Sequence, residues 1–208
     1  LLMASHAAES GDIQVMKEAL EALMTQAPKF LASIEDTVEY AKMTDGGFEL
    51  NEEEYNVRKL FGELTQKASV EYKGETTLQI DSSVPEILFG DAGRIRQAVV
   101  KLLRSSYALA SDGKLSIRVS CSDCGYAVVP EIRVSNTGGT LTLEKVSDVN
   151  ETLESKHQYL NSESWENIGL TVTGRIIRQM HGTISAEKNE SSGFDFVVKV
   201  PQLNISCK

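Results

Sequence analysis

A heptad repeat of apolar and small residues dominates the start of the chain, between residues 12 and 43. The repeat alternates steps of four and three residues until Thr37 interrupts it, and it runs through Met16, Leu20, Leu23, Ala27, Phe30, Ile34 and Ala41. This spacing places one apolar seam along a helix, as in helix bundles and coiled coils. Asp12 can cap its start, Pro28 should kink its interior, and the glycines of "TDGG" suit its end. We therefore predict one long helix over 12–43 that packs against a partner helix.

Beyond this helix, apolar residues recur with helical and with strand periodicity in turn. Phe48 and Leu50 alternate like a short strand, and Asn51 with Glu54 forms a capping box that would start a helix. The later pattern predicts, in chain order, a strand over 76–84, a helix over 91–110, strands over 113–120 and 130–136, a polar lid over 141–165, a helix within 165–182, and strands over 182–188 and 194–201. This order predicts an α+β fold: a two-layer α/β sandwich in which helices cover one face of a mixed sheet, preceded by the long bundle or coiled-coil helix.

The composition is that of an ordinary globular protein, with 41% apolar and 25% charged residues. Thirty acidic and 21 basic residues give a net charge of -9, which argues against nucleic acid or an anionic membrane as a partner. No apolar run approaches the roughly 20 residues of a membrane span, so we expect no direct membrane insertion in this part of the chain. The opening "LLMASH" suggests a fragment of a longer polypeptide.

The cysteines and the glycosylation sequons carry little functional information. Cys121 and Cys124 form a CSDC pair between two predicted strands, without a second pair or a histidine cluster. We therefore predict two reduced thiols in a surface loop and no metal site, rather than half a zinc site or a redox pair. The sequons at Asn150, Asn189 and Asn204 are weak signals, because nothing in the sequence indicates secretion.

Five segments resemble motifs of sensor histidine kinases. The segment "FGDAGRIRQAVVKLLRSSYALA" resembles GDPxRLRQVLxNLLSNAIKF, and "IRVSNTGG" resembles the glycine box VxDTGxG. The segment "NIGLTVTGRIIRQMHGTI" is similar to GLGLAISRxLVxxMGGxI, and "SSGFDFVVKVP" to KGSTFTVxLP. The exit of the heptad helix, "EYAKMTDGGFEL", resembles DxSKIEAGxxEL. Each match is weak by itself, but the five occur in one order with matching spacings over nearly the whole chain.

This resemblance implies a domain organisation. Residues 1–47 would be the end of the dimerisation and phosphotransfer hairpin, and 48–203 a histidine-kinase-like ATP-binding domain of the GHKL class (Bergerat fold), with a lid over 141–165 and a tail over 204–208. The family's phosphorylated histidine lies in the first helix of the hairpin, whereas His6 would lie at the bend. We interpret His6 as an exposed tail residue, and we predict no phosphoacceptor and no catalytic residue in this chain.

The resemblance also implies a nucleotide site in which the magnesium ligands are replaced. Two asparagines of the family face the phosphates, and the later one holds magnesium; they match Lys101 and Ser105, still at i and i+4 on one helix face. A serine hydroxyl is a poor substitute for an amide carbonyl, and a lysine one turn away opposes the ion. We therefore expect that magnesium contributes little to nucleotide binding. Lys101 would meet phosphate directly, point to solvent, or pair with a lid carboxylate such as Glu144.

The glycine boxes are replaced in part. The family's adenine-binding aspartate matches Asn136, which keeps a carbonyl acceptor but loses the charge-assisted bond. Gly138 is retained, whereas the second glycine of that box matches Thr140. In the last box Asn167 replaces the first glycine and Gly169 keeps the second, so fewer backbone N–H groups can approach phosphate. The candidate nucleotide-binding positions are Lys101, Ser105, Asn136, Gly138, Thr140, Asn167, Gly169, Leu170 and Asp195.

Asp195 stands where the family usually has a threonine near the base. Two interpretations are open: Asp195 accepts from the adenine amino group, or Asn136 donates its amide to Asp195 in a collapsed pocket without nucleotide. A buried carboxylate is costly without a partner, and the second interpretation supplies one without a ligand. We therefore predict the Asn136–Asp195 pair.

These replacements favour a degenerate histidine kinase core that signals by dimerisation and partner docking and binds ATP or ADP weakly. The alternatives are an active histidine kinase with atypical nucleotide ligands and, less favoured because of the heptad helix, another GHKL ATPase such as a gyrase or MutL relative. The expected partners are a second copy of the chain, through 12–43, and a receiver or phosphotransfer domain. The expected location is the cytoplasm, as a cytoplasmic protein or the cytoplasmic part of a membrane-bound sensor.

Overall fold

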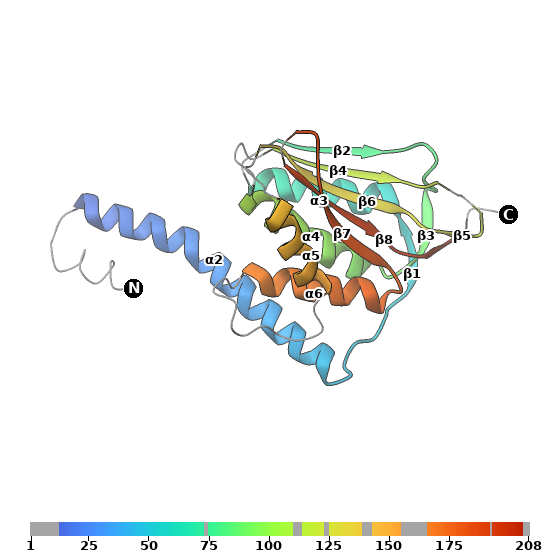
Figure 1. The fold of residues 1–208 in the computed structure, drawn as a ribbon, viewed down its shortest axis with the longest axis horizontal. Helices are drawn as coiled ribbons and strands as arrows, with labels where there is room; N and C mark the ends of the chain where they lie inside the picture. The colour runs from blue at the N-terminus through green and yellow to red at the C-terminus, as the bar shows by residue number, and fades with distance from the viewer. Residues whose placement is uncertain are drawn as a thin grey trace. The chain divides into compact units, whose positions relative to one another are not determined.

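The computed structural model describes residues 13–72, 75–109, 114–122, 125–138, 143–154, 166–191 and 193–205. The chain divides into two compact units, residues 1–47 and 48–208 (Figure 1). His6, Asp12, Cys124 and Thr140, for which the sequence suggested roles, lie outside the described residues. Within the described part of the chain, no helix is long and apolar enough to cross a membrane.

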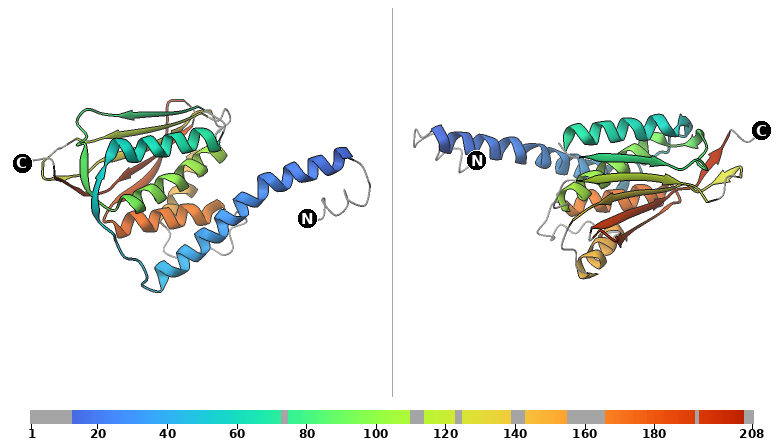
Figure 2. Two further views of the ribbon diagram at one scale, coloured as in Figure 1. Left: turned by 180° about the vertical axis from the view of Figure 1, so that it is seen from behind. Right: turned by 90° about the horizontal axis from the view of Figure 1, so that it is seen from above.

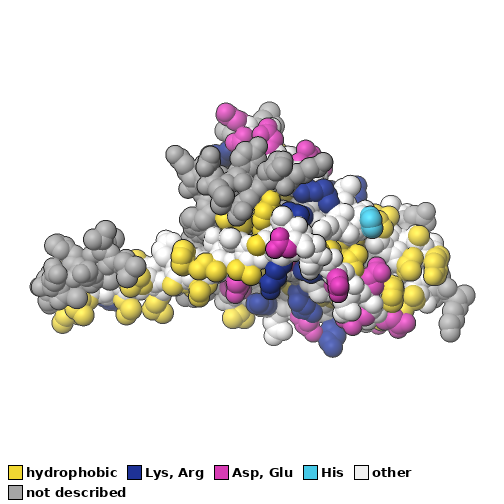
Figure 3. Space-filling model, turned by 90° about the horizontal axis from the view of Figure 1, so that it is seen from below, with side chains coloured by type: hydrophobic (Ala, Val, Ile, Leu, Met, Phe, Trp, Pro, Cys, Tyr) yellow, Lys and Arg dark blue, Asp and Glu magenta, His cyan; other side chains and the backbone are white. Residues whose placement is uncertain are grey.

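The described part of the first unit is built on helix α2 (Ile13–Thr44), which continues through Pro28. It ends in a Schellman motif: Gly46 has a φ of 80°, and the N–H of Gly47 donates to the carbonyl of Lys42 at 3.0 Å. The heptad seam is open to solvent, since its large side chains are between 38% and 68% exposed: Met16, Leu20, Leu23, Phe30 and Ile34. Figure 3 shows hydrophobic side chains along this helix.

The second unit is built on a five-stranded mixed sheet in the order β2-β4-β6-β8-β7. Its strands are β2 (Thr76–Ile80), β4 (Leu115–Ser120), β6 (Glu131–Asn136), β8 (Phe194–Lys199) and β7 (Thr183–Lys188). β2 and β4 are parallel, and the other pairs are antiparallel. The helices α3 (Val57–Glu71), α4 (Ala92–Leu109) and α6 (Glu166–Gln179) lie side by side over one face of this sheet (Figure 2). The predicted α+β class and mixed sheet are confirmed.

The core lies between these helices and the covered face of the sheet. Strand β6 alternates in burial, with Ile132 and Val134 buried and Arg133 on the open face. The helices contribute the fully buried side chains Phe61, Leu64, Leu102, Leu103, Val172, Ile176 and Ile177. The apolar residues that recur with a period of 3.6 in the helices and of 2 in the strands therefore pack against each other in one apolar layer.

A second, four-stranded sheet was not predicted. It has the order β1-β3-β9-β5 and consists of β1 (Glu53–Asn56), β3 (Ile87–Gly90), β9 (Gln202–Asn204) and β5 (Ala127–Val128). Strands of two to four residues are too short to show a period of two, so the sequence pattern did not reveal them. Asn204 belongs to β9 and not to a tail.

Three local predictions are wrong. The short strand is β1 at Glu53–Asn56 rather than 48–50, and Asn56, not Asn51, caps the following helix by accepting from the N–H of Lys59 at 2.9 Å. Glu54 pairs with Phe89 in the four-stranded sheet, and this pairing delays the start of the helix. Cys121 is 7% exposed at the end of β4, so it is not a surface thiol.

Candidate functional site

Helix α4 carries the first two candidate positions. Asp91 caps this helix: one carboxylate oxygen accepts from the N–H of Arg94 and the other from the N–H of Asn51, both at 2.8 Å. Lys101 and Ser105 follow one turn apart on α4. Lys101 is only 8% exposed, so the interpretation in which it points to solvent is wrong. Helix α4 itself packs on α6 and β6.

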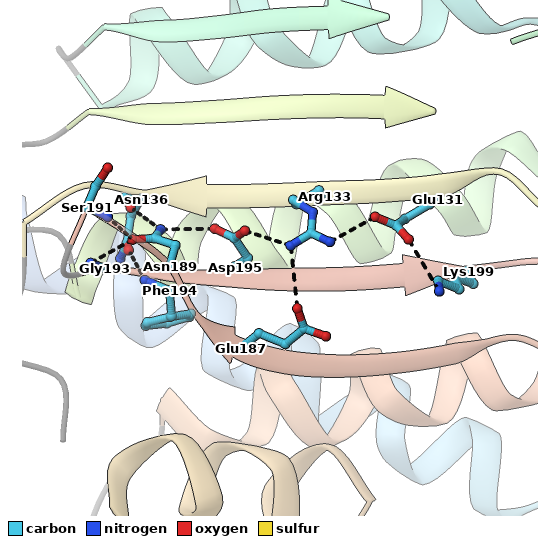
Figure 4. Close-up of polar contacts among 10 residues, drawn as sticks. All are labelled: Glu131, Arg133, Asn136, Glu187, Asn189, Ser191, Gly193, Phe194, Asp195 and Lys199. Atoms are coloured by element: carbon cyan, nitrogen blue, oxygen red, sulfur yellow. Dashed lines mark hydrogen bonds and ion pairs between the residues drawn. The ribbon is translucent and has the colours of Figure 1, made fainter. Parts of the chain in front are cut away.

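Asn136, at the end of β6, is completely buried. Its side-chain amide donates to the backbone carbonyl of Ser106 at 2.9 Å, and its side-chain carbonyl accepts from the N–H of Phe194 at 2.9 Å. The predicted donation from Asn136 to Asp195 is therefore wrong. Both polar ends of the Asn136 side chain are bonded to backbone groups, the amide to α4 and the carbonyl to β8; Figure 4 draws the contact with Phe194 of β8.

Asp195 lies on the open face of the sheet. It pairs in register with Ser135, whereas Asn136 is the next residue and points to the helical side. Its carboxylate accepts from Arg133 at 2.8 Å, and Arg133 also contacts Glu131 at 2.9 Å and Glu187 at 3.5 Å. The interpretation of Asp195 as an acceptor beside the adenine position of Asn136 is wrong for the same reason: the two side chains leave the sheet on opposite faces.

The ion pairs on the open face shift two pKa values. The hydrogen bond that Arg133 donates to Asp195 raises the pKa of the Arg133 guanidinium, with a further contribution from Glu131, although partial burial acts in the opposite direction. Partial burial acts to raise the pKa of the Glu131 carboxyl, but hydrogen bonds and charge from Arg133 and Lys199 lower it overall. The three carboxylates of this row, Glu131, Asp195 and Glu187, all form ion pairs with Arg133, and Glu131 also pairs with Lys199.

Asn189 links Asn136 with Asp195, whose side chains lie on opposite faces of the sheet. The sequence did not identify Asn189 as a site residue. Its amide nitrogen donates to the backbone carbonyl of Asn136 and to the carboxylate of Asp195, both at 2.9 Å. Its carbonyl accepts from the N–H groups of Ser191 at 3.0 Å and Gly193 at 2.9 Å (Figure 4). An asparagine just before a glycine-containing turn is a sequence signal for such bonds.

The glycine-box backbone retains one left-handed residue. Gly138 has a φ of 65°, and its N–H donates to the carbonyl of Ser191 at 3.3 Å, in the turn between β7 and β8. Asn167 and Gly169 lie in the first turns of α6, which begins at Glu166, so Asn167 is helical and does not form a cradle loop. Leu170 is 5% exposed and belongs to the core.

Part of the predicted lid is a packed helix, α5 (Leu143–Glu154). Leu153 is fully buried, and its carbonyl accepts from the Arg178 guanidinium. The Asn150 amide bonds both backbone groups of Ala186 on edge strand β7, at 2.9 and 2.7 Å. The sequence of α5, LEKVSDVNETLE, is mostly polar and has no clear apolar periodicity, which explains why the pattern did not show this helix.

No metal site is formed by the residues described: no three histidine, cysteine, aspartate or glutamate side chains gather as ligands. The site is thus centred on Asn136 at the end of β6, whose side chain is hydrogen-bonded to backbone groups. The other candidate positions are Lys101 and Ser105 on α4 and the start of α6.

Comparisons with known proteins agree with this architecture. The family model described as "Histidine kinase-, DNA gyrase B-, and HSP90-like ATPase" matches residues 90–204. Sporulation kinase B of Bacillus subtilis (strain 168) is 27% identical over 125 residues, which cover 60% of this chain and 28% of that protein. The sensory/regulatory protein RpfC of Xanthomonas campestris pv. campestris is 23% identical over 192 residues, which cover 89% of this chain and 26% of that protein. The chain therefore spans only 26–28% of the length of these two relatives.

Solved structures share the fold at low sequence identity. Full-length ShkA, crystallised in complex with AMPPNP, matches with a TM-score of 0.70 and 17% identity over 91% of this chain and 39% of that one. The histidine kinase AdeS of Acinetobacter baumannii matches with a TM-score of 0.62 and 18% identity over 94% of this chain and 89% of that one.

Proposed function

This chain belongs to the histidine kinase-, DNA gyrase B-, and HSP90-like ATPase family and has the ATP-binding core of a sensor histidine kinase. From this premise we propose that it acts in two-component signalling as a degenerate kinase core. In this proposal it dimerises and docks a partner domain, such as a receiver or phosphotransfer domain, without transferring a phosphoryl group. We propose the cytoplasm, or the cytoplasmic part of a membrane-bound sensor, as its location.

The state of Asn136 is the observation that carries this proposal. The position that the resemblance assigns to adenine recognition is completely buried, and its amide and carbonyl are bonded to Ser106 and Phe194. Because Asn136 is completely buried, a base could reach the same carbonyl only by displacing the groups that now pack against it, among them the N–H of Phe194. Leaving that buried N–H unpaired would cost about 1–3 kcal/mol.

The phosphate end supports the same proposal. A cation and a hydroxyl, at Lys101 and Ser105, stand where the resemblance expects two amide side chains, and the start of α6 is helical at Asn167. If the magnesium ligand, the charged adenine contact and one cradle N–H each contribute about 1–2 kcal/mol, their loss weakens binding by about a hundredfold to ten-thousandfold.

Calorimetric titration with ATP, with and without magnesium, tests the proposal. We expect weak or absent binding and no dependence on magnesium. The double variant Lys101→Asn with Ser105→Asn is the matched control, since it restores both amide side chains without changing Asn136. We expect no tight binding in this variant either, because the base end stays closed. Tight ATP binding by the unchanged chain that disappears on chelation of magnesium would refute the proposal.

An active histidine kinase with atypical ligands is the second candidate. Two observations favour it: Gly138 keeps a left-handed backbone in the glycine box, and Lys101 is a buried cation that could meet a phosphate without magnesium. In that case ATP would bind with similar affinity in the presence and absence of magnesium, and Lys101→Ala would abolish binding. No feature of the described residues favours a gyrase-like or MutL-like ATPase over these two.

A further inference from the structure

The regular ladder between β6 and β8 ends at the pair Ser135–Asp195. Beyond this pair, the backbone groups of β6 and β8 form hydrogen bonds with asparagine side chains instead of with each other. The N–H of Phe194 bonds the side chain of Asn136, and the backbone carbonyl of Asn136 bonds the side chain of Asn189. Two asparagines thus extend the contact between the strands by one more step, at the end of the sheet where the resemblance places the base.

We propose that Asn189 is the positioning residue of this end of the site: its side chain holds Asn136 against Phe194 and Ser106 without any nucleotide. The inference rests on the proposed function, in which this end of the site no longer binds a base. Asn189 lies in the turn between β7 and β8 and contacts neither Phe194 nor Ser106 in the recorded hydrogen bonds. Its side chain can act on Phe194 through Asn136 and through Gly193, the residue before Phe194, whereas of these two routes only the bond to the Asn136 carbonyl uses the amide nitrogen.

The hydrogen bonds of Asn189 fix the orientation of its amide. The nitrogen faces two acceptors, the Asn136 carbonyl and the Asp195 carboxylate, and the oxygen faces two donors, the N–H groups of Ser191 and Gly193. A flipped amide would turn donors toward donors and acceptors toward acceptors. Asp195 is itself held by Arg133 at 2.8 Å, so the nitrogen has a fixed anchor on the open face.

Close packing makes this arrangement specific. A β-carbon added at Gly193 would overlap both the backbone and the side-chain oxygen of Asn136. The turn therefore approaches Asn136 at a distance that only glycine permits. In addition, the N–H of Gly138 bonds the carbonyl of Ser191 at 3.3 Å, so the glycine box is tied to the same turn.

Two substitutions separate the halves of the Asn189 side chain. Asn189→Ala removes all four bonds. Asn189→Asp keeps an acceptor for Ser191 and Gly193 but has no donor for the Asn136 carbonyl, and it puts a second carboxylate beside Asp195. Glu190→Ala changes the exposed neighbour in the same turn and is the matched control. All three are made in the whole nucleotide-free chain.

Amide hydrogen exchange gives the readout. If Asn189 positions Asn136, the Phe194 amide exchanges at least tenfold faster in both Asn189 variants, relative to Ile117 in the centre of the sheet. The amides of Ser191 and Gly193 lose protection in Asn189→Ala but keep it in Asn189→Asp. Glu190→Ala leaves all of them unchanged. We also expect the melting temperature of Asn189→Ala to fall by about 5 °C.

Two outcomes would overturn the inference. Unchanged relative protection of Phe194 would show that Asn189 organises only its own turn. Equal acceleration of Phe194 and Ile117 would show that it contributes to global stability alone. Neither outcome depends on nucleotide binding. Tight magnesium-dependent ATP binding by the unchanged chain would refute the proposed function instead, and would leave the exchange result for the nucleotide-free chain as it is.

Discussion

At the scale of single residues, Asn136 decides between the two candidate functions, and Asn136→Asp tests it. This change restores the residue that the resemblance expects. The new carboxylate can still accept from the N–H of Phe194, but its other oxygen faces the Ser106 carbonyl without a proton. In a completely buried position this loses a hydrogen bond and opposes two acceptors, so we expect a loss of about 1–3 kcal/mol in the free energy of unfolding at neutral pH.

The pH dependence of Asn136→Asp follows from the same contacts. Burial and the Ser106 carbonyl favour the protonated carboxyl, so its folded-state pKa should lie above the unfolded value of about 3.9. The folded state then binds more protons between the two pKa values, and stability falls as the pH rises through that window. Urea unfolding of the variant and of the unchanged chain at several pH values measures the difference. Unchanged stability together with new magnesium-ATP binding would favour the active kinase.

The same residue shows how far the sequence could predict the site. The matched motifs identified Lys101, Ser105 and Asn136 as neighbouring positions on α4 and β6, and the structure brings these two elements into contact. The partner of Asn136 could not be predicted, because it depends on strand register. Asp195 and Asn136 are close in space but leave the sheet on opposite faces, and Asn189 reaches between them from a turn.

At the scale of helices and strands, two glycines in helix interiors allow a matched test of packing. Gly62 in α3 has open space around an added β-carbon, whereas a β-carbon at Gly174 in α6 would overlap the Leu153 carbonyl of α5. The intrinsic gain from glycine to alanine in a helix is about 1 kcal/mol in both cases. We expect Gly62→Ala to stabilise the fold by about that amount, and Gly174→Ala to destabilise it by about 1–3 kcal/mol because α5 must move.

Thermal unfolding of the two variants measures this contrast. Equal stabilisation by both substitutions would mean that α5 is not packed on α6 in solution. This test also bears on the predicted lid over 141–165, because α5 forms part of that segment and is held by Asn150, Arg178 and buried Leu153. A lid that moves as a whole would release all three contacts.

The elements that the sequence predicted are those with several turns of amphipathic pattern, such as α4 and α6, or with alternating apolar residues, such as β4 and β6. The elements that it missed are short or polar. β5 has two residues, and Leu153 is the one fully buried side chain among those described in α5. Their formation depends on partners distant in sequence, β9 for β5 and α6 with β7 for α5.

At the scale of the whole molecule, the open face of the sheet and helix α2 differ in what they offer a partner. A row across the open face reads Gln79, Arg118, Arg133, Val197 and Ser185, with one apolar residue. Ten of the fifteen exposed large hydrophobic side chains among the described residues lie on α2. Such a concentration marks a surface that another helix covers, whereas the polar face can remain in water.

We therefore predict that the chain is a homodimer through α2, and that Ile34→Glu weakens it. Ile34 lies in the heptad seam and is 45% exposed in the single chain, whereas Val15, 39% exposed, lies outside the seam. In a symmetric dimer each substitution acts twice. Removing about 1.5 kcal/mol of apolar burial per copy raises the dissociation constant by about a hundredfold for Ile34→Glu. The control Val15→Glu introduces the same charge on the same helix and should leave the constant nearly unchanged. Light scattering and sedimentation over a concentration series measure both; a monomeric parent chain at high concentration, or equal weakening by the two variants, would contradict dimerisation through this seam.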